Sequence, residues 1–90
     1  MPRVEAIVRG IVQGVGFRYH VKELSNSFKV TGYVRNLPDG CVEIVCEGDT
    51  EELRALIEAI KRLPPPVMVE GVEETWKEAS SDIEGFHIYY

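Results

Sequence analysis

The order of two kinds of hydrophobic pattern is the feature of this sequence that most constrains its fold. Two segments repeat apolar residues at spacings of three and four, which is the stripe of an amphipathic helix. The stripes consist of Phe17, Val21, Leu24 and Phe28 in the first segment, and of Leu53, Leu56, Ile57, Ile60 and Leu63 in the second. Strand-like alternation occupies residues 4–12, 30–34, 42–46 and 86–90, and less regularly residues 67–76. The predicted order is therefore β-α-β-β-α-β, with a short fifth strand at the C-terminus.

Turn and capping residues separate these segments. Asn-Leu-Pro-Asp-Gly at residues 36–40 is typical of a turn between two strands. Asp-Thr-Glu-Glu at residues 49–52 resembles a capping box at the start of the second helix. The three prolines at residues 64–66 cannot continue that helix, and the polar residues 78–85 are expected to form a loop.

The simplest way to bury both helical stripes is to place both helices on one face of an antiparallel sheet. We therefore predict an α+β fold, the ferredoxin-like β-α-β-β-α-β sandwich with a short fifth C-terminal strand. Ninety residues with 44% hydrophobic content suit one globular domain, which we expect over residues 1–90. This fold supports many functions, so the function has to be argued from a site.

Charge and composition limit the partners of the chain. Fifteen acidic residues against ten basic ones give a net charge of −5, which argues against a nucleic-acid surface. The apolar runs are far too short for a membrane span, and the first residues enter a strand pattern without a signal-peptide segment. We expect a cytoplasmic monomer that contacts neither a membrane nor a nucleic acid.

The two cysteines and two histidines are not arranged for a disulfide or a metal. Cys41 and Cys46 would face opposite sides of one strand, with their Cα atoms about 16 Å apart, which is too far for a disulfide. The scattered positions of these residues match no metal-ligand pattern. We therefore predict free cysteines, no metal and no cofactor.

The junction between the first strand and the first helix is the strongest candidate for a binding site. Its sequence is Gly-Ile-Val-Gln-Gly-Val-Gly-Phe-Arg at residues 10–18. Glycines let several backbone N–H groups point at one spot, and a helix start adds further unpaired N–H groups. Arg18 is unfavourable at this end of the helix dipole unless an anion compensates it. The pattern indicates a phosphoryl site, although a plain strand–turn–helix junction has the same glycine pattern.

The same junction resembles the signature of the acylphosphatase family. Further similarity lies in Gly-Tyr-Val-Arg-Asn at residues 32–36, Val-Glu-Ile-Val-Cys-Glu-Gly at residues 42–48, and the ending Phe-His-Ile-Tyr-Tyr at residues 86–90. Together these segments span the chain from end to end. The resemblance implies a hydrolase that cleaves the carboxyl–phosphate bond of small acyl phosphates to a carboxylate and inorganic phosphate. It also implies in-line attack by water, with neither a metal nor a cofactor.

By motif position, the resemblance makes Arg18 the phosphate-binding arginine and Asn36 the residue that positions the attacking water. The phosphate cradle corresponds to the loop of Gln13, Gly14, Val15, Gly16, Phe17 and Arg18. Two positions depart from the family pattern. Lys29 stands where the family usually has a glycine after the first helix, a place that favours positive φ. Tyr89 stands where many members have an arginine.

The chemistry of an acyl phosphate suits these residues. Its leaving group is a carboxylate whose conjugate acid has a pKa of about 4 to 5, so it departs without a general acid. The site must neutralise the phosphoryl oxygens and align a water opposite the leaving oxygen. A guanidinium with backbone N–H groups can neutralise the phosphoryl oxygens, and a carboxamide can align the water.

Two other functions fit parts of the sequence. A non-catalytic module that binds phosphate or a carboxyl phosphate would use the same loop. The resemblance implies such a role for acylphosphatase-like domains inside larger carbamoyl-transfer proteins. A ferredoxin-like RNA-binding or regulatory domain would need exposed aromatic residues and a basic face on its central strands. We expect the side chains of Phe17, Trp76 and the tyrosines to pack, and Arg35 to pair with a nearby carboxylate.

Overall fold

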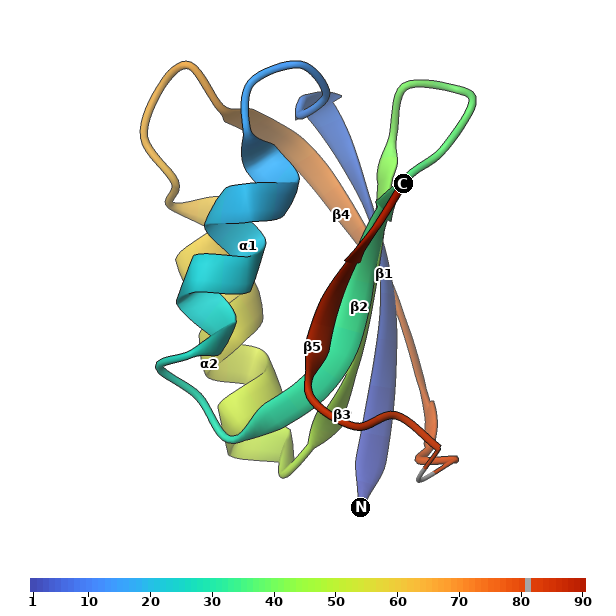
Figure 1. Cartoon of the computed structure of the whole chain (residues 1–90). Coiled ribbons are helices and arrows are strands. Elements are labelled where there is room, and N and C mark those ends of the chain that lie inside the picture. The colour runs from blue at the N-terminus through green and yellow to red at the C-terminus, as the bar shows by residue number, and fades with distance from the viewer. Residues whose placement is uncertain (81) are drawn as a thin grey trace.

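Two helices pack against one face of a five-stranded sheet in the computed structural model, which describes residues 1–80 and 82–90 (Figure 1). The elements in chain order are β1 (Pro2–Ile11), α1 (Phe17–Ser25), β2 (Val30–Asn36), β3 (Val42–Gly48), α2 (Thr50–Lys61), β4 (Met68–Glu78) and β5 (Phe86–Tyr89). The predicted sandwich is confirmed, including the short C-terminal strand. Neither helix in the described part of the chain has the length and apolarity needed to cross a membrane.

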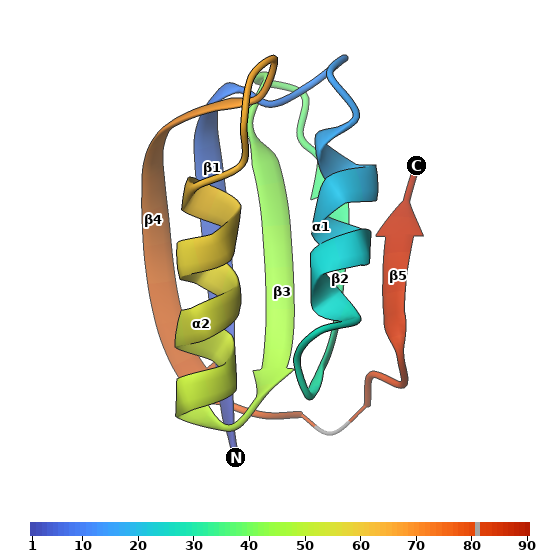
Figure 2. The same cartoon turned by 90° about the vertical axis from the view of Figure 1, so that its left-hand side faces the viewer.

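The strands lie in the order β4-β1-β3-β2-β5. Strand β1 is antiparallel to both β3 and β4, and β2 is antiparallel to β3. Strand β5 is the exception, because it runs parallel to β2. The chain leaves β4 at one edge of the sheet and crosses to the opposite edge before β5 begins (Figure 2). This crossing returns the C-terminus to the end of the molecule where α1 begins (Figures 1 and 2).

The core lies between the helices and the facing side of the sheet. Its fully buried side chains come from both helical stripes and from alternate strand positions: Val4, Ala6, Val8, Val34, Val42, Ile44, Phe17, Val21, Leu53, Leu56 and Ile60. Burying one such large apolar side chain contributes about 1.5–3 kcal/mol relative to leaving it exposed. Leu24, Phe28 and Leu63 are half-buried and pack against the edge of this core. Both predicted stripes therefore face the sheet.

The end of α1 and the start of α2 differ from the sequence expectation. Helix α1 ends at Ser25, three residues before Phe28, so Lys29 does not occupy the position directly after the helix. Asp49 precedes α2 in an extended conformation, and its side chain makes no capping hydrogen bond to a described residue. Glu52, the expected partner in the capping box, instead accepts a hydrogen bond of 2.7 Å from the backbone N–H of Lys29. This carboxylate thus ties the loop after α1 to α2.

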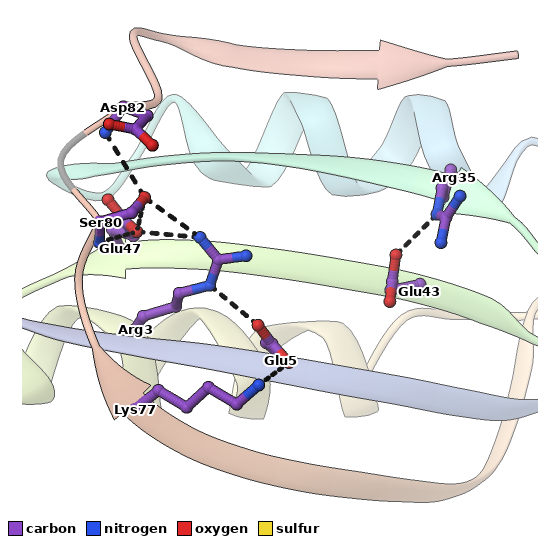
Figure 3. A network of polar contacts seen from close by, with 8 residues as sticks. All are labelled: Arg3, Glu5, Arg35, Glu43, Glu47, Lys77, Ser80 and Asp82. Carbon is purple, nitrogen blue, oxygen red and sulfur yellow. Dashed lines mark hydrogen bonds and ion pairs between the residues drawn. The ribbon is translucent and has the colours of Figure 1, made fainter.

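A polar network on the sheet face away from the helices holds the segment that follows β4 (Figure 3). Arg3 lies in register between Glu47 of β3 and Lys77 of β4. Its guanidinium contacts the buried Glu47 at 3.2 Å and Glu5 at 2.9 Å, and Lys77 contacts Glu5 at 3.0 Å. The Glu47 carboxylate also accepts hydrogen bonds from the backbone N–H and the hydroxyl of Ser80. The network therefore anchors the chain where it starts its crossing toward β5.

Candidate active site

A pocket of about 200 Å³ lies where the loop after β1, the start of α1, the end of β2 and the C-terminus meet. Its lining residues are Val12, Gly14, Gly16, Phe17, Arg18, Tyr19, Asn36, Ile88 and Tyr90. The loop after β1, the β2–β3 turn and the C-terminus lie at the same end of the molecule (Figure 1). The fold thus brings Arg18 and Asn36 to one pocket, although they lie in different elements.

Residues 13–18, called the cradle loop below, curl through two glycines with positive φ. Gly14 has a φ of 77° and Gly16 a φ of 75°, a left-handed conformation that glycine adopts without a steric penalty. A Cβ atom at Gly14 would meet nothing within 4 Å. The backbone conformation, rather than lack of space, is therefore the reason for glycine at this position.

The start of α1 is left open to an anion. Gly16 is the capping residue of α1, and among the described residues no side chain caps this end and no acidic residue lies in the first turn. The first N–H groups of a helix have no partner within the helix, and the dipole makes this end positive. Together these features are suited to a negatively charged group.

The C-terminal residues hold the guanidinium of Arg18 at the pocket. Its Nη1 donates a hydrogen bond of 2.7 Å to the backbone oxygen of Tyr89. Its Cζ lies 4.7 Å from the centroid of the Tyr90 ring, a cation–π contact. A guanidinium has more N–H groups than this single hydrogen bond uses, so Arg18 keeps donors for a ligand.

The pairing of β5 with β2 brings these contacts beside Asn36. Tyr89 lies opposite Arg35 in the parallel ladder, one residue before Asn36. The Tyr89 ring stacks on Tyr33 with a centroid distance of 4.8 Å. The departure from the family pattern at Tyr89 is therefore taken up by an aromatic pair, while the backbone oxygen of the same residue contacts Arg18.

Asn36 ends β2 opposite Val42 in the antiparallel ladder. The next residue, Leu37, donates its N–H to the oxygen of Cys41 at 2.9 Å, and this hydrogen bond closes the β2–β3 turn. The Asn36 side chain is exposed and lines the pocket. No residue in the described part of the chain forms a hydrogen bond with its carboxamide, which leaves both its donor and its acceptor available.

Four residues of the cradle loop line the pocket, and two do not. Gly14, Gly16, Phe17 and Arg18 are among the lining residues. The Gln13 side chain points to the β2–β3 turn instead, where it donates hydrogen bonds of 2.8 Å to two backbone oxygens. Val15 is half-buried against the hydrophobic core. These two side chains therefore hold the loop in place from outside the pocket.

Two tyrosines at the pocket were not expected from the sequence. Tyr19 has an exposed fraction of 60%, and Tyr90 is fully exposed at 101%, so neither packs in the core. A signal for Tyr19 was its position directly after Arg18 and off the apolar stripe of α1. Tyr90 could be found only from the tertiary structure, because its contact with Arg18 depends on the pairing of β5 with β2.

The charged side chains and thiols around the pocket limit the kinds of reaction that it can support. Arg18 is the only basic residue among the described residues that line it. Arg35, the residue before Asn36, instead pairs with Glu43 at 2.6 Å, as expected. Burial raises the pKa of the Cys46 thiol to about 12. Burial, followed by the charge of Asp39, raises the pKa of the Cys41 thiol. Neither free cysteine is thus poised as a thiolate nucleophile at neutral pH.

Comparison with known proteins finds similarity over nearly the whole chain. The profile of the acylphosphatase family matches residues 4–88. A curated acylphosphatase from Caldivirga maquilingensis is 47% identical over 89 residues, covering 98% of this chain and 94% of the relative. The crystal structure of acylphosphatase from Bacillus subtilis superposes on this chain with a TM-score of 0.94 at 38% sequence identity. The match covers 100% of each chain.

The structure of HypF from T. kodakarensis is also similar, with a TM-score of 0.87 and 33% identity. That match covers 100% of this chain but 12% of HypF. The similarity is therefore almost full-length for the proteins named acylphosphatase and confined to a small part of HypF.

Proposed function

The chain belongs to the acylphosphatase family, which hydrolyses acyl phosphates to a carboxylate and inorganic phosphate, and we propose that Arg18, Asn36 and the cradle loop perform this reaction here. A non-catalytic binding module is not favoured, because relatives matched over nearly their whole length are acylphosphatases. The observation that carries the residue assignment is the single pocket that Arg18 and Asn36 line together with Gly14 and Gly16.

The first step is the binding of the phosphoryl group. Its oxygens accept hydrogen bonds from backbone N–H groups of the cradle loop and the first turn of α1. The Arg18 guanidinium adds a charge-assisted contact, which is stronger than a neutral hydrogen bond. Because Tyr89 and Tyr90 already hold this guanidinium, it needs little reorientation when negative charge develops on the phosphoryl oxygens.

The second step is attack by water in line with the leaving group. The Asn36 carboxamide positions the water through its oxygen and its N–H groups. As the new bond from water to phosphorus forms, the bond to the acyl oxygen breaks, and the carboxylate departs with the electron pair. Both protons of the water end on the phosphate product, so neither a general acid nor a metal-bound hydroxide is required.

Titration with inorganic phosphate tests the site. We expect phosphate to inhibit competitively and to shift the backbone amide resonances of residues 14–18 in NMR spectra. An Arg18→Ala variant, used in the same titration, is expected to lose most of this response. Shifts confined to another part of the molecule, such as the hollow lined by Arg54 and Trp76, would contradict the assignment of the cradle loop.

We also propose an oligomeric state and a cellular location for the chain. The edge strand β4 carries charged residues along its length, which discourages pairing with another strand, and the other edge strand, β5, has only four residues. These features support a monomer, which light scattering after size exclusion tests. The two free cysteines support a reducing compartment such as the cytoplasm.

A further inference from the structure

One side chain connects the cradle loop to the turn that carries Asn36. The Gln13 side-chain nitrogen donates hydrogen bonds of 2.8 Å to the backbone oxygens of both Leu37 and Cys41. Leu37 and Cys41 flank the last pair of the β2–β3 ladder, Asn36 with Val42. The carboxamide of Gln13 therefore bridges the turn at the point where Asn36 leaves the sheet.

The two acceptors determine what Gln13 can do. A carboxamide has two N–H donors on its nitrogen, and both are used by backbone oxygens here. The opposite orientation would place the side-chain oxygen against two carbonyl oxygens, so the network defines which end is the nitrogen. The Gln13 side chain consequently keeps no N–H donor for a phosphoryl group.

The two connected segments are anchored to different degrees. The cradle loop is anchored by Val12, directly before Gln13, and by Phe17 near the other end of the loop. Both side chains have an exposed fraction of 1%. The turn at residues 38–40 is exposed throughout. Loss of the bridge would therefore release the turn more than the loop.

We infer that Gln13 is a positioning residue for catalysis, which sets the distance and angle of Asn36 relative to the phosphoryl group by holding the β2–β3 turn against the cradle loop. This inference rests on the proposed roles of Arg18 and Asn36. It assigns Gln13 to the alignment of the attacking water rather than to phosphate binding. Alignment matters only for in-line attack, so it affects the rate more than the affinity.

The test is the replacement of Gln13 by methionine, which keeps a similar length and removes both donors. We expect kcat for hydrolysis of acetyl phosphate to fall on the order of 10- to 100-fold, as for other small misplacements of reacting groups. We expect the inhibition constant of inorganic phosphate to change less than about 2-fold. Gln13→Ala replaces the methionine variant if that variant does not fold.

The matched control is Asp39→Ala. The Asp39 carboxylate accepts a hydrogen bond of 3.0 Å from the backbone N–H of Cys41 in the same turn, but it makes no hydrogen bond to a described residue of the cradle loop. We expect this variant to retain kcat within about 3-fold, on the scale of small surface changes. An equal loss in Asp39→Ala and Gln13→Met would show that the turn only needs to be intact, and would overturn the inference.

A double variant separates positioning from a general structural role. If Gln13 acts through Asn36, adding Gln13→Met to Asn36→Ala should lower kcat no further, because interacting sites are not additive. Multiplication of the two effects, or a loss of phosphate affinity in Gln13→Met as large as its loss of kcat, would overturn the inference. Wild-type kcat in Gln13→Met would do the same while leaving the proposed function intact. Wild-type kcat in Asn36→Ala would instead refute the proposed function.

Discussion

Replacement of Arg18 by alanine removes the only basic side chain among the described residues that line the pocket. The half-buried guanidinium makes a hydrogen bond to Tyr89 and a ring contact with Tyr90. Truncating one partner of a charge-assisted contact of this kind costs about 2–5 kcal/mol in the complex with the transition state. Since about 1.36 kcal/mol corresponds to a factor of ten, kcat/KM should fall by about 30-fold to about 5,000-fold.

The assay is phosphate release from acetyl phosphate, with kcat/KM measured for Arg18→Ala, Arg18→Lys and Arg35→Ala. Lysine restores the charge but not the planar, forked donor geometry, so partial recovery is expected. Arg35→Ala is the matched control, since Arg35 lies next to Asn36 and is exposed but pairs with Glu43 outside the pocket. An exposed ion pair contributes little to stability, so this control should remain close to wild-type. Near-wild-type activity in Arg18→Ala, or an equal loss in Arg35→Ala, would refute the reasoning.

Four further outcomes are expected. Asn36→Ala should lower kcat by several orders of magnitude with nearly unchanged phosphate affinity, as steady-state kinetics and calorimetry can show. Activity should persist in excess EDTA and after thiol alkylation; loss on chelation with recovery on adding a divalent ion would reveal a missed metal site. Tyr90→Ala should raise KM, because Arg18 loses its ring contact, and an unchanged KM would contradict that role. Hydrogen bonding to Lys77 and contact with Arg3 lower the pKa of Glu5 below its ordinary value of 4.5. The stability contributed by Glu5 is therefore present above pH 4.5 and lost as the pH falls through its folded pKa. A Glu5→Gln variant lacks this titrating group, so its free energy of unfolding should decrease less on acidification than that of the wild-type.

Local patterns predicted the elements and the core because each depends on neighbouring residues. Both predicted stripes face the sheet, although their outer members Leu24, Phe28 and Leu63 are only half-buried. The helix ends were harder to predict, because Glu52 forms a hydrogen bond with Lys29 across two elements instead of capping its own helix. That choice is made by tertiary packing, which local sequence does not contain.

The residues of the candidate site differ in the same way: some could be predicted from local sequence, and others depend on the tertiary structure. The placement of Gly14, Gly16 and Arg18 beside one another could be predicted from the sequence, since a loop and the helix after it are adjacent in the chain. The contact of Arg18 with Tyr90 could not, because it requires the crossing from β4 and the parallel pairing of β5. The direction of the Gln13 side chain was likewise invisible, since its acceptors lie 24 and 28 positions further along the chain.

The partners of Arg18 explain how this arginine remains available to an anion in a chain with a net charge of −5. Arg3 and Arg35 form ion pairs with carboxylates, which neutralise their charges. Arg18 is held by a backbone oxygen and an aromatic ring instead, and neither group carries a formal charge. A carboxylate in the place of either would orient the guanidinium equally well but would compete with the phosphoryl group for it and repel the incoming dianion. Among the described residues, Arg18 thus combines a fixed orientation with a positive charge that no carboxylate pairs, and the proposed phosphoryl transfer requires both properties.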